Sequence, residues 1–238
     1  RAETLRRLGS AILMLLDPKL LLLIPTYFFT GISGGFVNGV LTSEIIKPSL
    51  GTHNVGFLIA AYSAFDSVTA VLIGKLSDRI GPRIAVIIGG ISYSLFIWFW
   101  VIACHVPTLL RFSLAKGSAP YVLSVSSSII GIADGSIQSV FSIAVTSLIF
   151  IDRTEAAFSN LKVWQSLGYA VAFLTGPFIS LRSKVWILAG SFIFSMLSIA
   201  TLDKFVCSLS RSKLFNFVSS HKVESESLLP IHVQQQQQ

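Results

Sequence analysis

Charged residues are scarce in this sequence. Only 12% of its 238 residues are Asp, Glu, Lys or Arg, whereas 53% are hydrophobic. An ordinary soluble domain has about 25% charged residues, so this shortage excludes the polar surface of a typical soluble enzyme. The composition indicates a protein whose solvent is lipid.

Cysteine and the residues of common active sites are scarce as well. The two cysteines, Cys104 and Cys207, fall at opposite ends of the helix map below, which excludes a disulfide framework. The sequence lacks a glycine-rich phosphate loop with Lys, a His-Glu-x-x-His helix and a nucleophile elbow. The four histidines lie at the ends of apolar stretches or in the tail: His53, His105, His221 and His232. We therefore predict no enzyme activity, no catalytic residue, no metal site and no cofactor.

What the sequence does contain is six long apolar stretches almost free of Lys and Arg. They cover residues 20–42, 55–74, 84–104, 120–150, 163–181 and 185–203. Each is close to the roughly 20 residues that a helix needs to cross hydrocarbon. None alternates over about 10 residues, as the strands of a membrane barrel do. We expect an all-α membrane protein with six transmembrane helices.

The distribution of the 18 Lys and Arg residues predicts the topology. With the amino end in the cytosol, 13 of them fall in cytosolic segments and 5 in outer segments. This asymmetry places both termini of a multi-pass membrane protein in the cytosol and supports an even number of spans. We expect the plasma membrane or endosomes as its location. The net charge of +7 is thus explained by topology, and no nucleic-acid partner is predicted.

Three regions follow from this map. Residues 1–19 form a basic cytosolic lead-in, 20–203 the six-helix transmembrane domain, and 204–238 a polar cytosolic tail that ends in a glutamine run and is expected to be disordered. The chain starts with Arg1 rather than Met. We therefore expect it to be a fragment or the carboxy-terminal part of a longer protein.

The tail contains one short pattern with a functional interpretation. Glu224 is followed after three residues by Leu228 and Leu229, which resembles the acidic dileucine sorting signal of endosomal cargo. A chance match is the alternative, because so short a pattern arises often.

Polar and small residues form stripes at helical spacing on the first, second and fourth predicted helices. The stripes are Gly31, Gly34, Gly35, Asn38 and Thr42; Ser63, Asp66, Ser67, Ala70 and Gly74; and Ser127, Gly131, Asp134, Gln138 and Ser142. They predict that these helices face a protein interior or cavity, and that the third and sixth helices face lipid. The alternative is that the stripes only let helices pack closely.

Two of these stripe residues, Asp66 and Asp134, are acidic. A carboxylate near the centre of a bilayer costs about 2.5–3.5 kcal/mol on insertion scales, so it is usually kept for a pathway or a partner. No Lys or Arg is expected at a similar depth. Either both acids are protonated, or their partners lie outside this sequence.

The loop after the second predicted helix reads GKLSDRIGPR, residues 74–83. It resembles the cytosolic signature of the major facilitator superfamily, with matching residues Gly74, Asp78, Arg79, Gly81 and Arg83. Glycines allow a tight turn, and the charges can clamp helix ends through ion pairs and the helix dipole. In that superfamily the loop occurs in each of two six-helix halves.

Two further stretches narrow the resemblance. GTHNVGF at 51–57 and EAAFSNLKVWQSLGYAVAF at 155–173 look like the carboxy-terminal half of the uncoordinated-93 family, the ion-channel regulatory branch of that superfamily. The residues that carry the match are Asn54, Glu155, Asn160, Trp164 and Gly168. Asn160, Trp164 and Gly168 share one helix face, for which an interfacial Trp anchor with a glycine packing contact is the alternative reading.

The resemblance implies half of a twelve-helix fold, with an amino-terminal six-helix half as partner. It further implies an accessory role, in which the protein regulates a potassium channel or assists the trafficking of another membrane protein. A proton-coupled transporter of small solutes, working through Asp66 or Asp134, is the rival hypothesis, and a packing scaffold without activity is the third. The sequence does not name a substrate, a client, an organelle or an oligomeric state.

Overall fold

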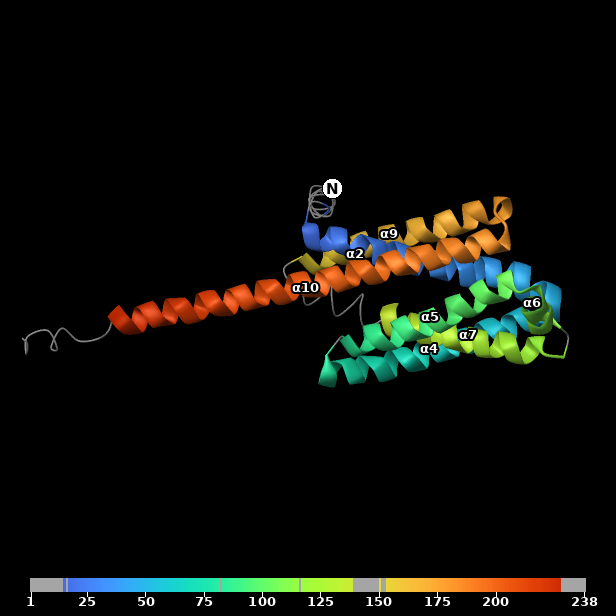
Figure 1. Cartoon of the computed structure of the whole chain (residues 1–238), viewed down its shortest axis with the longest axis horizontal. Helices are drawn as coiled ribbons and strands as arrows, with labels where there is room; N and C mark the ends of the chain where they lie inside the picture. Colours follow the sequence, from blue (N-terminus) through green and yellow to red (C-terminus); the bar gives the residue numbers. More distant parts are fainter. Residues whose placement is uncertain are drawn as a thin grey trace, which may run out of the picture.

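The computed structural model describes residues 15, 17–81, 83–115, 117–138, 150 and 153–227, with side chains up to Lys204 except that of Asp78. This part of the chain is helical throughout (Figure 1). Residues 1–14 and 16 of the predicted lead-in and 228–238 of the predicted tail lie outside the described residues.

The first predicted helix is longer than the sequence indicated. α2 (Pro18–Gly35) continues directly into the π-helix η1 (Phe36–Ile46) and the short α3 (Lys47–Leu50). Asp17 caps its start, because the carboxylate accepts the backbone N–H of Lys19 at 2.9 Å and the following proline suits a first helical position. The result is one continuous apolar segment, Pro18–Leu50, long enough to cross a membrane.

Two glycines with positive φ separate the next two helices from their neighbours. Gly51 (φ 87°) precedes α4 (Thr52–Ile80), and Gly81 (φ 103°) ends it just before α5 (Arg83–His105). Only glycine adopts this backbone region without strain. The tight turn predicted within 74–83 therefore lies at Gly81.

After α5, the residues that the structure describes form four more α-helices and one 3-10 turn. The short α6 (Pro107–Leu114) leads to α7 (Ala119–Ser136), and α9 (Thr154–Thr175) is followed by η4 (Gly176–Phe178) and α10 (Leu181–Ser227). Within the described residues, four segments are long and apolar enough to span a membrane: Pro18–Leu50, Thr52–Ser77, Arg83–His105 and Leu181–Lys204. The predicted span 120–150 is described only as far as Gln138.

The helices pack in two groups around one continuous hydrophobic core. α4, α5 and α7 lie together, as do α2, α9 and α10, and α10 also contacts α5 (Figure 1). The largest fully buried side chains come from both groups and include Trp100, Tyr27, Tyr93 and Phe29. The Phe29 and Tyr93 rings meet edge to face at 4.8 Å between centroids, which joins α2 to α5.

Glycines set the closest helix crossings. A Cβ added to Gly168 of α9 would lie 2.9 Å from the Gly31 Cα of α2, and one added to Gly135 of α7 would lie 3.1 Å from the backbone nitrogen of Ala70 in α4. Gly131 meets the same stretch of α4 one turn earlier. Small residues at such spacing let the backbones of membrane helices touch.

The expected lipid-facing roles of the third and sixth helices are wrong for one face of each. α5 buries Tyr93 and Trp100, and α10 buries Phe192 and Ser195, because both helices pack inside the bundle. By contrast, α4 was expected to face a protein interior, but only 17% of its most apolar stretch is buried among the described residues. A stripe of small and polar residues marks one face of a helix as different from the others. The sequence does not show which neighbouring helix, if any, covers that face.

α10 also departs from the predicted boundary at 203. It runs from Leu181 to Ser227, 47 residues or roughly 70 Å, and its second half extends clear of the bundle (Figure 1). The backbone of 204–227 is therefore helical, where the sequence analysis expected disorder. The physical reason is that no glycine or proline occurs between Gly190 and Pro230 to end the helix.

Candidate functional site

A completely buried carboxylate lies where three helices meet. Asp134 of α7 has 0% exposure. Its Oδ2 accepts a hydrogen bond from the Tyr62 phenol of α4, and its Oδ1 accepts one from the Tyr93 phenol of α5. One acidic side chain therefore joins α4, α5 and α7.

Local sequence explains how this acid reaches its two partners. Asp134 is flanked by Gly131 and Gly135, whose missing side chains bring α7 against the α4 backbone next to Tyr62. The Tyr93 ring is held by Phe29 at 4.8 Å and by Phe192 at 5.8 Å. These ring contacts thus fix the position of the Tyr93 phenol.

The second acid, Asp66, lies beside this cluster on α4, one turn after Tyr62. It is half-buried, and its carboxylate is near enough to influence Asp134 electrostatically. Within the described residues its side chain accepts no hydrogen bond, and no basic group acts on either acid. The structure thus places two acidic side chains, Asp66 and Asp134, in the same part of the bundle without a basic partner among the described residues.

The other two predicted intramembrane polar residues are Asn38 and Gln138. Asn38 of η1 is exposed and donates from Nδ2 to the Gly34 carbonyl of its own helix at 2.9 Å. Gln138 is half-buried at the end of the described part of α7. Neither has a described hydrogen bond to the acids.

The motif at residues 74–83 contributes an ion pair that joins α5 to α10. Arg83 donates from Nε and Nη2 to Asp203 Oδ1 at 3.1 and 3.0 Å, with both side chains mostly exposed. Arg79 is exposed, and a Cβ on Gly74 would meet nothing within 4 Å. The predicted clamp therefore has a described partner, Asp203, which the sequence analysis did not identify. The side chain of Asp78 lies outside the description.

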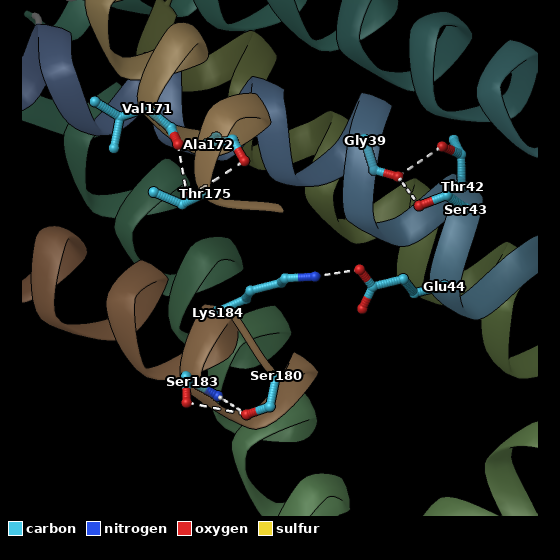
Figure 2. Close-up of polar contacts among 10 residues, drawn as sticks. All are labelled: Gly39, Thr42, Ser43, Glu44, Val171, Ala172, Thr175, Ser180, Ser183 and Lys184. Carbon is cyan, nitrogen blue, oxygen red and sulfur yellow. Dashed lines mark hydrogen bonds and ion pairs between the residues drawn. The ribbon is translucent and has the colours of Figure 1, made fainter. Parts of the chain in front are cut away.

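A second ion pair lies near the start of α10. Lys184 donates to Glu44 Oε1, joining the first turn of α10 to η1 (Figure 2). Nearby, Arg182 Nη2 donates to the Cys104 carbonyl at 3.0 Å. This pair could not be predicted from the sequence, because Lys184 and Glu44 are 140 residues apart.

The residues of the family motif lie mainly on the packed face of α9. Gly168 is in contact with α2, and buried Asn160 donates from Nδ2 to the Ala156 carbonyl at 2.9 Å. The half-buried Trp164 has an indole N–H without a partner among the described groups. Glu155 is exposed at the start of α9, and Asn54 donates to the Leu50 carbonyl at 2.6 Å.

The sequence of the chain matches a known family model. The model of the Major Facilitator Superfamily covers residues 23–210. The chain belongs to this superfamily. Similar proteins also confirm its predicted resemblance to the uncoordinated-93 branch.

The relatives carry unc-93 names. UNC93-like protein 3 of Arabidopsis thaliana is 33% identical over 171 residues, which are 72% of this chain and 35% of that protein. Protein unc-93 homolog A of Danio rerio is 32% identical over 176 residues, 73% of this chain and 35% of that protein. A Caenorhabditis elegans protein, provisionally named potassium channel regulatory protein unc-93, is 26% identical over 159 residues, 67% of this chain and 21% of that protein.

The matched region spans about a third of the length of the first two of these relatives. No solved structure matches the chain.

Tyr62 and Tyr93, whose phenols donate to Asp134, were not predicted from the sequence. Tyr62 and Tyr93 stand in apolar runs, where a tyrosine usually indicates packing or an interfacial anchor. One signal was available for Tyr62, which lies four residues before Asp66 and so shares its helix face. Nothing in the spacing of Tyr93 indicates its partner.

Proposed function

We propose that the chain forms a six-helix half of a twelve-helix major-facilitator fold, with both termini in the cytosol. The two ion pairs support this arrangement. Arg83 and Asp203 meet on the side that the charge distribution assigns to the cytosol, and Glu44 meets Lys184 on the side assigned to the exterior. An amino-terminal half would then cover the exposed face of α4.

The function that we propose is that of a membrane accessory protein, which regulates a potassium channel or assists the trafficking of another membrane protein. The observation that carries this proposal is that Asp134 is fully buried and that both of its oxygens accept hydrogen bonds from phenols. A proton-coupling acid must exchange with water during the cycle, whereas Asp134 has no exposure and a phenol on each oxygen. The name of the Caenorhabditis elegans relative supports the channel version of this role.

The test expresses the protein with a panel of potassium channels and compares Asp134→Asn with wild type. We expect altered channel current or altered channel surface level, while the surface level of the variant itself is maintained. Asp203→Asn is measured alongside, because it makes the same chemical change at the exposed Arg83 ion pair and so shows what the loss of a carboxylate outside the cluster does. Channel currents and levels that are identical with and without the wild-type protein would count against the accessory role.

A proton-coupled transporter is the second candidate, and Asp66 is the observation that favours it. This carboxylate is only half-buried and lies on the mostly uncovered helix α4, so water can reach it more easily than Asp134. If transport is the function, Asp66→Asn abolishes pH-driven uptake of the solute and leaves channel behaviour unchanged. Uptake and current are therefore measured on the same variants.

A further inference from the structure

α5 and α10 run antiparallel, and an arginine joins them at each end of their contact. At one end Arg83 of α5 donates to Asp203 of α10. At the other end Arg182 of α10 donates to the Cys104 carbonyl of α5 at 3.0 Å. Both helices are long and apolar enough to span a membrane. Each end of the α5–α10 contact is therefore expected where the hydrocarbon gives way to lipid headgroups.

The two arginines differ in the charge of their partners. Arg83 has a carboxylate partner, whereas the described partner of Arg182 is a backbone carbonyl, which accepts a hydrogen bond but carries no net charge. The nearby Lys184 is neutralised by Glu44. Arg182 is exposed and lies in the first turn of α10, where the helix dipole disfavours positive charge. An anion beside Arg182 would therefore be favourable, and the guanidinium has further N–H donors to bind it.

A pair of rings lies at the same end of the two helices. The His105 ring of α5 meets the Trp186 ring of α10 edge to face, with 5.6 Å between the centroids. The His105 Nδ1 lies 2.9 Å from the Val101 carbonyl, which fixes the orientation of the imidazole. Trp186 follows Arg182 by one helical turn and is 47% exposed. A half-exposed tryptophan at the end of a span is typical of the boundary between hydrocarbon and headgroups.

Exposed apolar side chains continue from this end along both helices. Trp98 and Ile102 of α5, and Ile187 and Ile193 of α10, are between 43% and 51% exposed. A cation, an interfacial aromatic ring and an apolar surface thus follow one another along the helix axes. Phosphate, glycerol backbone and acyl chains follow one another in the same order in a phospholipid.

We propose that Arg182, with Trp186 and His105 beside it, binds the headgroup of an anionic phospholipid where α5 ends and α10 begins. The guanidinium donates two parallel N–H bonds to the phosphate oxygens, and the acyl chains lie along the exposed apolar side chains of the two helices. A free phosphate ion shares the headgroup chemistry but has no part that fits this apolar surface. The proposal depends on neither the accessory nor the transporter hypothesis.

The test measures the thermal unfolding midpoint of the purified full chain in a neutral detergent. Dioleoyl phosphatidylglycerol, dioleoyl phosphatidylcholine and inorganic phosphate are added in separate titrations at constant ionic strength. A ligand of the folded form raises the midpoint as its concentration rises, so we expect a larger rise with phosphatidylglycerol than with phosphatidylcholine and none with phosphate. In Arg182→Gln the phosphatidylglycerol concentration that gives half of the rise should increase about tenfold. Arg83→Gln and Lys47→Gln, changes of exposed cations elsewhere, should keep the wild-type response.

Four results would overturn the proposal. Equal rises with the two lipids mean general solvation of the apolar surface, and a rise with inorganic phosphate alone means a site for a soluble anion. A phosphatidylglycerol response that is unchanged in Arg182→Gln, or equally weakened in all three variants, means that no single arginine carries the binding. If Arg182→Gln fails to fold, Arg182→Lys and Trp186→Leu keep the test decisive. The first retains the charge without the planar fork, the second removes the aromatic ring, and each should give a response weaker than that of the wild type.

Discussion

Lys184 and Glu44 form an ion pair that ties the start of α10 to η1 (Figure 2). The two partners are not equivalent. The Lys184 side chain is only 7% exposed, whereas that of Glu44 is 35% exposed. Water can therefore solvate the carboxylate if the pair is broken, but it cannot solvate the ammonium equally well. The pair also anchors a π-helix, a conformation that is uncommon and usually short.

This asymmetry gives the first prediction. Glu44→Gln leaves a buried ammonium without its counter-charge and should lower the free energy of unfolding by about 2–4 kcal/mol. Lys184→Gln removes the buried charge itself and should cost less, and the double variant should be more stable than Glu44→Gln alone. Unfolding midpoints of the purified proteins measure these differences. The opposite order, with Lys184→Gln the worse variant, would show that the carboxylate is the partner that depends on the pair.

The glycine crossings give the second prediction. Gly135→Ala and Gly168→Ala place a methyl group against backbone atoms of the neighbouring helix, and overpacking of this kind costs about 1–3 kcal/mol. Gly56→Ala and Gly74→Ala are matched controls, since a Cβ there meets nothing within 4 Å. Because alanine favours helices by up to about 1 kcal/mol over glycine, the controls should be neutral or stabilising. An equal loss of unfolding free energy at all four positions would contradict the close helix contacts at Gly135 and Gly168.

The helices and the family could be predicted from the sequence, whereas most contacts between helices could not. The all-helical class and the family followed from long apolar runs and from local motifs, because both depend on residues close together in sequence. Asp66 and Asp134 stood out because a carboxylate is unusual at membrane depth. Their partners did not, since Tyr93 reaches Asp134 across 41 residues and such pairings depend on how whole helices pack. The π-helical continuation of α2 was missed for the same reason.

Cys104 illustrates this limit. The sequence analysis placed it correctly at a helix end, but α5 buries it at 8% exposure, which removes it as a topology reporter. The third prediction therefore uses Thr108→Cys on exposed α6. From the charge asymmetry, a membrane-impermeant thiol reagent should label this residue in intact cells.

Cys207 should react with the same reagent only after the membrane is permeabilised, because the charge distribution assigns 204–238 to the cytosol. A Cys207→Ser variant provides the background for the Thr108→Cys measurement. Labelling of Cys207 in intact cells would reverse or refute the proposed topology.

The last prediction concerns the two phenols on Asp134. Tyr93 is fully buried and Tyr62 is half-buried, so water can replace the lost hydroxyl in Tyr62→Phe more easily than in Tyr93→Phe. A hydrogen bond to a charged group contributes about 1.5–3 kcal/mol. Tyr93→Phe should therefore lower the free energy of unfolding by an amount near this range, and Tyr62→Phe by less. Tyr121→Phe, on a side chain that is 76% exposed, should change nothing.

A double-mutant cycle separates this hydrogen bond from general packing. In an Asp134→Asn background the charge is gone, so Tyr93→Phe should cost less there than in the wild type. The same cycle with Phe192→Leu, which alters the packing of the Tyr93 ring without touching the carboxylate, should be closer to additive. If Tyr93→Phe costs the same with Asp134 and with Asn at that position, the phenol stabilises the bundle through its ring alone.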